Sequence, residues 1–162
     1  MSIPILKDFR NPNTNWQINP IQNWQICPAK NWQINPARNW HINPNRNWQV
    51  NPAHNWRINP LRNWKLNPYR NVNVNPLSPT FCGLYVINTN SFTCDFYLVK
   101  TEMQNVMLGY SETNNLSFLL IGIDKIFAVY TLTFEYIGFL CSNSKDGYNW
   151  FDLEGNWLYF VV

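Results

Sequence analysis

The sequence predicts an all-β protein in two parts, an N-terminal array of short repeats and a small C-terminal antiparallel β domain. Three observations predict it. An eight-residue repeat fills most of residues 1–78, its apolar and polar positions alternate, and residues 79–162 contain apolar runs of strand length between turn-forming residues. We therefore expect a cap with a degenerate unit at 1–14, eight repeats at 15–78 and the β domain at 79–162.

The repeat has the consensus Asn-Trp-x-Ile-Asn-Pro-x-x and runs without a gap from Asn15 to Ser78. Trp and Ile are two positions apart, so on a strand they would share one face. A proline every eight residues would break a helix each time, which excludes a helix. We expect each unit to be a short strand with Trp in the same core as Ile. The expected structural residues are Trp16, Trp24, Trp32, Trp40, Trp48, Trp56 and Trp64, with Pro20, Pro28, Pro36, Pro44, Pro52, Pro60 and Pro68.

The Asn-Pro-x-x half of each unit predicts a tight turn. Proline fixes φ at the second turn position, the preceding Asn side chain can hydrogen-bond the turn backbone, and a residue before proline favours an extended backbone. Two units per coil would give a flattened β-solenoid in which identical side chains stack about every 4.8 Å. The alternative is an antiparallel meander whose apolar face is covered by the second half or by another subunit.

Charge is divided unevenly along the chain. Residues 1–78 hold nine Lys or Arg and one acid, a net charge of +8, whereas residues 79–162 hold three Lys and eight acids, a net charge of −5. The cations gather at position eight of the repeat, where the candidate anion-binding residues are Lys30, Arg38, Arg46, Arg62 and Arg70. Three interpretations stay open: a solvated basic face, attraction to the acidic second half, or a site for an anionic partner such as nucleic acid.

The second half predicts six to eight short antiparallel strands. Asp152–Asn156 resembles a hairpin loop with Gly155 at positive φ. The final strand is very apolar, so we expect it to lie in a sheet or an oligomer interface, with Trp157, Tyr159 and Val161 as contact residues. The expected strands are Phe81–Ile87, Cys94–Lys100, Val106–Tyr110, Leu116–Ile123, Ile126–Phe134, Tyr136–Cys141, Tyr148–Leu153 and Trp157–Val162.

Catalytic and metal-binding patterns are missing from the sequence. His41 and His54 replace ordinary repeat residues, and Asp152 and Glu154 flank a turn, where acids usually only solvate the loop. The four cysteines do not have the spacing of a disulfide framework or a zinc site. We expect no enzyme activity, no cofactor and no metal. The N-terminus lacks the pattern of a secretory signal, and no uncharged run reaches about 18 residues, so we expect a cytoplasmic protein without a membrane-spanning helix.

The functional hypothesis is a non-enzymatic scaffold or interaction protein that forms a homo-oligomer or filament. The first alternative is a binder of nucleic acid or another anionic partner through the Lys and Arg row. Carbohydrate binding, which requires exposed Trp rings, and a membrane-active hairpin are lower alternatives. The direction of the Trp side chains separates these hypotheses, because inward rings serve architecture and outward rings serve a ligand.

Overall fold

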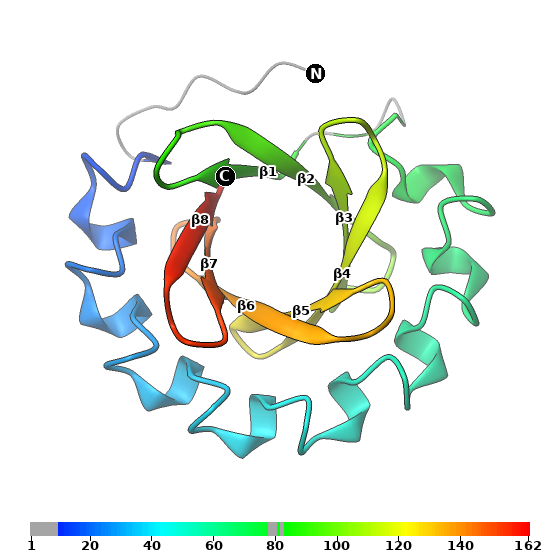
Figure 1. Cartoon of the computed structure of the whole chain (residues 1–162), viewed down its shortest axis with the longest axis horizontal. Helices are drawn as coiled ribbons and strands as arrows, with labels where there is room; N and C mark the ends of the chain where they lie inside the picture. The colour runs from blue at the N-terminus through cyan, green and yellow to red at the C-terminus, as the bar shows by residue number, and fades with distance from the viewer. Residues whose placement is uncertain (1–9, 78–80, 82) are drawn as a thin grey trace.

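The computed structural model describes residues 10–77, 81 and 83–162. Antiparallel strands β1 to β8 form a closed barrel in chain order, with β8 pairing back to β1. The repeats form an arc around the outside of this barrel (Figure 1). The strands are β1 Tyr85–Asn88, β2 Cys94–Lys100, β3 Val106–Ser111, β4 Leu116–Ile123, β5 Ile126–Thr131, β6 Tyr136–Ser142, β7 Tyr148–Asp152 and β8 Trp157–Val161.

The barrel confirms the predicted antiparallel β domain, and all eight expected strands are present with ends shifted by a few residues. The β7–β8 hairpin also has Gly155 at a φ of +90°, as expected. The interior is filled by apolar side chains from every strand, including Val86, Leu120 and Leu140, and by aromatic contacts of Trp150 with Phe96 and Phe118. Closure leaves every strand paired on both sides, which removes exposed sheet edges.

Each repeat unit contains one turn of 3-10 helix and no strand. The strand prediction for residues 15–78 is therefore wrong within the part that the structure describes. The asparagine at position one caps the turn, and its side-chain oxygen accepts a hydrogen bond from the N–H of position three. A turn of three residues fits between the prolines, where a longer helix does not. The turns are η2 Trp16–Ile18, η3 Trp24–Ile26, η4 Trp32–Ile34, η5 Trp40–Ile42, η6 Trp48–Val50, η7 Trp56–Ile58, η8 Trp64–Leu66 and η9 Val72–Val74.

The solenoid and the meander are both wrong, because the repeats contain no β-strand among residues 10–77 and follow the barrel wall side by side (Figure 1). We call residues 15–77 the belt. Position four of each unit is buried, as for Ile42 at 1% exposure, whereas Trp40 is 64% exposed. The expectation that Trp and Ile share one core is therefore corrected: at about 120° per residue in a 3-10 helix, positions two and four point in different directions.

The Asn-Pro-x-x half of the unit confirms the predicted turn. In the first full unit, the carbonyl of Asn19 accepts hydrogen bonds from the N–H groups of Gln22 and Asn23, and its side-chain oxygen accepts one from the N–H of Ile21 at 2.9 Å. Asn19 has the extended backbone expected before proline. Among the expected structural prolines, Pro20, Pro28, Pro36, Pro44 and Pro52 are buried, and Pro60 and Pro68 are half-buried.

The belt packs on the outer wall of the barrel through its position-four side chains. Val50, Ile58, Leu66 and Val74 join outward residues of β2 to β5 in one cluster, and Ile34 and Ile42 join outward residues of β5 to β7 in another. Because the belt covers this wall, both faces of strands such as β3 are apolar and buried.

Some barrel side chains also hydrogen-bond the main chain of the belt. Tyr130 Oη donates to the carbonyl of Val50 at 2.7 Å, and Asn149 Nδ2 donates to the carbonyl of Ile18 at 3.2 Å. Tyr110 Oη and Cys141 Sγ donate in the same way to the carbonyls of Val74 and Ile34. The acceptor is the position-four carbonyl each time, so these bonds fix the position of the buried side of the belt relative to the barrel strands.

Parts of the predicted domain organisation lie outside the described residues. Most of the N-terminal cap is in residues 1–9, and the predicted boundary after Ser78 falls within residues 78–80. Cys82 is also outside the described part of the chain, while Cys27, Cys94 and Cys141 are free thiols.

Candidate binding surface

The Trp row is the main exposed apolar feature of the belt. We use this name for Trp16, Trp24, Trp32, Trp40, Trp48, Trp56 and Trp64. Each of these side chains is between 54% and 64% exposed, and each opens its 3-10 turn directly after the capping asparagine. In the last unit Val72 takes the same place. The rings therefore recur once per turn along the arc.

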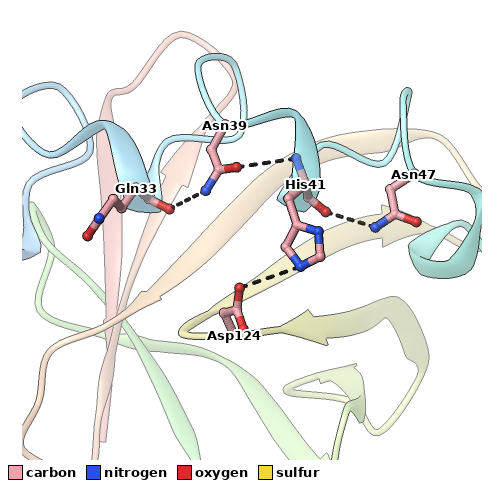
Figure 2. A network of polar contacts seen from close by, with 5 residues as sticks. All are labelled: Gln33, Asn39, His41, Asn47 and Asp124. Carbon is pink, nitrogen blue, oxygen red and sulfur yellow. Dashed lines mark hydrogen bonds and ion pairs between the residues drawn. The ribbon is translucent and has the colours of Figure 1, made fainter.

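The asparagines beside the row are used by the belt itself, as Figure 2 shows for three successive units. The side-chain oxygen of Asn39 accepts from the N–H of His41 at 3.2 Å, while its Nδ2 donates to the carbonyl of Gln33 at 2.9 Å. Asn47 continues the pattern by donating to the carbonyl of His41 at 2.8 Å. Position-one asparagines thus link each turn to the one before it and have little capacity left for a ligand.

Clefts between the belt and the end of the barrel are lined by successive members of the Trp row. The cleft lined by Trp24 and Trp32 has a volume of about 760 Å³ and reaches the β4–β5 loop. Trp48 and Trp56 line a cleft of about 630 Å³ that reaches the β2–β3 loop, and Trp16 and Trp24 line one of about 310 Å³ beside the β6–β7 loop. In a barrel of sequential antiparallel strands these three loops lie at one end, so the Trp row runs along that rim.

Positive charge accompanies the Trp row. The candidate anion-binding residues Lys30, Arg38, Arg46, Arg62 and Arg70 are all exposed, and none of them forms an ion pair with a described residue. Position eight lies just before the next capping asparagine. Its occupants Gln22 and His54 line two of the clefts, whereas the five candidate cations are exposed outside the three clefts.

Position three adds a second row of polar side chains that the sequence analysis did not single out. Gln25, Gln33, Gln49 and Arg57 line the clefts, and the Arg57 guanidinium lies 5.9 Å from the centre of the Trp56 ring. The signal was present in the repeat, since this position holds Gln, His, Arg, Lys or Asn in every unit.

One contact at this rim pairs a histidine of the belt with a carboxylate of the barrel. His41 Nε2 lies 3.8 Å from Asp124 Oδ2, which joins position three of one unit to the β4–β5 loop (Figure 2). Both side chains are more than half exposed, so this pair contributes little to stability. It also places the Asp124 carboxylate in the cleft between Trp24 and Trp32.

The carboxylates considered for catalysis lie apart from this surface, in the β7–β8 turn. Burial opposes ionisation of Asp152 slightly, but hydrogen bonds from Asn156, Glu154 and Gly155 hold the pKa of its carboxyl below the ordinary value. Asp152 Oδ1 accepts from the N–H groups of Glu154 and Asn156 at 3.0 and 2.8 Å, a turn-stabilising role. His54 is exposed, and the described residues contain no cluster of three metal-binding side chains.

The predicted oligomer contacts lie on β8. Val161 is fully buried and Tyr159 is half-buried, both packed with the interior of the barrel. Trp157 is half-buried on the outer wall, and its indole N–H donates to the carbonyl of Tyr159 at 3.0 Å. Since β8 pairs with β1 and β7, it has no free edge, which was the physical reason for expecting self-association there.

Comparison of the chain with protein-family models, with curated proteins and with solved structures gave no match. Among the described residues, no helix has the length and apolar character needed to cross a membrane.

Proposed function

We propose that the protein is a non-enzymatic interaction protein whose belt binds a linear anionic polymer along the Trp row. One observation carries the proposal: seven Trp rings, each more than half exposed, form a periodic row on a belt that contains no acidic residue. Exposed aromatic patches mark interaction sites, and Trp and Arg are the residues that contribute most to binding at interfaces.

The barrel provides the rigidity that such a site needs. Position-four side chains and the bonds from Tyr130 and Asn149 fix each turn to the wall, so the rings are held in a set order before the ligand arrives. A preformed surface loses less conformational entropy on binding than a flexible repeat would. A linear partner with its own repeat can then use several equivalent contacts at once, which raises its overall affinity.

The experiment compares the wild type with the triple variant Trp32→Ala/Trp48→Ala/Trp56→Ala on immobilised polymers at low salt. We expect the wild type to be retained by single-stranded polynucleotide and by sulfated polysaccharide, and to elute early from neutral β-glucan. The triple variant should lose most of the retention on at least one of the anionic polymers.

The matched control is Ile21→Ala/Leu61→Ala/Tyr69→Ala, which removes exposed apolar side chains from position seven instead of the Trp row. Its retention should equal that of the wild type. The proposal is wrong if neither anionic polymer retains the protein, or if both triple variants lose retention equally. If the wild type is a homo-oligomer that the Trp variant dissociates and the control variant does not, the Trp row serves self-assembly instead.

A further inference from the structure

We infer that the linear polymer is single-stranded nucleic acid, with bases stacked against the Trp row and phosphates held by the adjacent cations. This inference rests on the proposed function and names its ligand class. Proteins that bind single strands without sequence preference combine aromatic stacking surfaces with a positively charged track along the backbone. Both features occur together in five of the seven Trp-containing units, the exceptions being residues 15–22 and 47–54.

The stacking surfaces come from the clefts. Each is lined by two successive Trp residues, as for Trp24 and Trp32 or Trp48 and Trp56, together with side chains of the barrel end. A base that stacks on an exposed Trp face would lie at the mouth of such a cleft. The rings are already more than half exposed, so no rearrangement of the belt is required.

The charge track comes from positions eight and three. Position eight supplies Lys30, Arg38, Arg46, Arg62 and Arg70, and position three adds Arg57 and Lys65. No Asp or Glu occurs between Phe9 and Cys94, so among the described residues the acids near the rim come from the barrel. The described acid that lines a cleft, Asp124, is accompanied by Lys125 and faces His41. The belt therefore carries positive charge that no acid of its own offsets.

Hydrogen-bonding capacity separates a phosphodiester from a polysaccharide. A phosphate needs only donors, which Lys, Arg and Gln amides supply. A sugar chain carries many hydroxyl groups, each of which needs an acceptor when it is desolvated. The belt has no carboxylate, and oxygens such as Oδ1 of Asn39 and Asn47 already accept main-chain bonds. A belt with cationic donors and no carboxylate therefore favours a phosphodiester chain over a neutral glycan.

The test measures binding of labelled (dT)20 by fluorescence anisotropy, against an abasic strand with the same number of phosphates. We expect (dT)20 to bind at least tenfold more tightly than the abasic strand and to quench Trp fluorescence. Trp32→Ala/Trp48→Ala/Trp56→Ala should weaken (dT)20 binding by tenfold or more, because each stacked base contributes substantially. The same variant should leave binding of the abasic strand unchanged.

The charge arm uses Arg38→Gln/Arg46→Gln/Arg62→Gln/Arg70→Gln, with Lys100→Gln at the end of β2 as the control. Loss of four phosphate contacts should weaken both strands and lower the slope of log affinity against log salt by about 3, since each contact contributes about 0.7 for single strands. Lys100→Gln should leave the slope unchanged.

Several outcomes would overturn the inference. Equal affinity for (dT)20 and the abasic strand, or for (dT)20 and a duplex of the same length, would show that bases do not stack on the Trp rings. Trp-dependent binding of dextran sulfate without binding of (dT)20 would leave the proposed function standing and identify a sulfated glycan as the ligand class. Binding of none of these polymers would overturn both proposals.

Discussion

At the scale of single residues, asparagine is the side chain that makes the repeat fold. At position one it caps the 3-10 turn and also donates to the previous unit. Asn47, for example, accepts a hydrogen bond from the Gln49 N–H and donates one to the His41 carbonyl. At position five it accepts from position seven and fixes the proline turn, as Asn43 does with Asn45. Cys27 replaces asparagine in one unit and has no oxygen for this bond, yet its main-chain turn bonds remain. One substitution is therefore tolerated.

The prediction at this scale concerns Asn47→Ala. It removes one acceptor and one donor and leaves the Gln49 N–H and the His41 carbonyl without protein partners, so we expect the free energy of unfolding to fall by about 1–2 kcal/mol. Chemical denaturation measures this change. The control Asn45→Ala lies at exposed position seven of the preceding unit and should change stability by less than about 0.5 kcal/mol. Equal effects of the two variants would contradict the capping role.

At the scale of the element, the 3-10 turn divides the unit into a buried and an exposed side. Trp56 and Ile58 are two residues apart, yet Trp56 is 55% exposed and Ile58 is 1% exposed. Alternation of apolar and polar residues is shared by strands and by such short turns, so periodicity alone favoured the wrong element. The decisive local signal was the asparagine before each Trp, which is typical of a helix N-cap.

The prediction at this scale compares the two sides of one turn. Ile58→Ala should lower the free energy of unfolding by about 2–4 kcal/mol, because it opens a cavity between the belt and the barrel. Trp56→Ala should cost about 1 kcal/mol or less despite removing a larger side chain, since most of that ring faces solvent. A strand with both residues in the core would give large losses for both variants, so thermal and urea unfolding of the pair distinguish the two structures.

At the scale of the whole molecule, belt and barrel complete each other. The outer wall of the barrel is apolar and would be exposed without the belt, and a single unit of eight residues cannot enclose a core. Buried phenols connect the two parts: Tyr130 and Tyr110 lie in the interface and donate to belt carbonyls. Burial raises the pKa of both hydroxyls well above the ordinary value of 10.0, with nearby Tyr136 and Tyr69 adding to the shift.

These shifts predict alkaline unfolding. Above about pH 10 the two phenols ionise in the unfolded chain but remain protonated in the folded protein, so the unfolded state binds fewer protons. Below about pH 9 these two groups should not make the free energy of unfolding depend on pH. It should then fall by up to about 1.4 kcal/mol per pH unit for each buried phenol. Urea unfolding from pH 8 to 11 measures the slope.

The variant Tyr130→Phe should make this decline shallower, although it starts from a stability lower by about 1–2 kcal/mol because the Val50 carbonyl loses its partner. Asn47→Ala, which lowers stability by a similar amount without removing a phenol, is the control and should keep the wild-type slope. An unchanged slope in Tyr130→Phe would show that this phenol does not remain protonated in the folded state.

The sequence by itself determined the eight-residue period, the proline turns, the strands of residues 79–162 and the row of cations, because each depends on neighbouring residues. Only the tertiary structure decided that the strands close into a barrel and that the repeat wraps around it. Closure depends on the pairing of β1 with β8, and no local pattern encodes partners that lie far apart in the chain. The direction of the Trp row was decided in the same way. The barrel wall takes the position-four side chains, and the rings that the sequence placed in a core remain exposed.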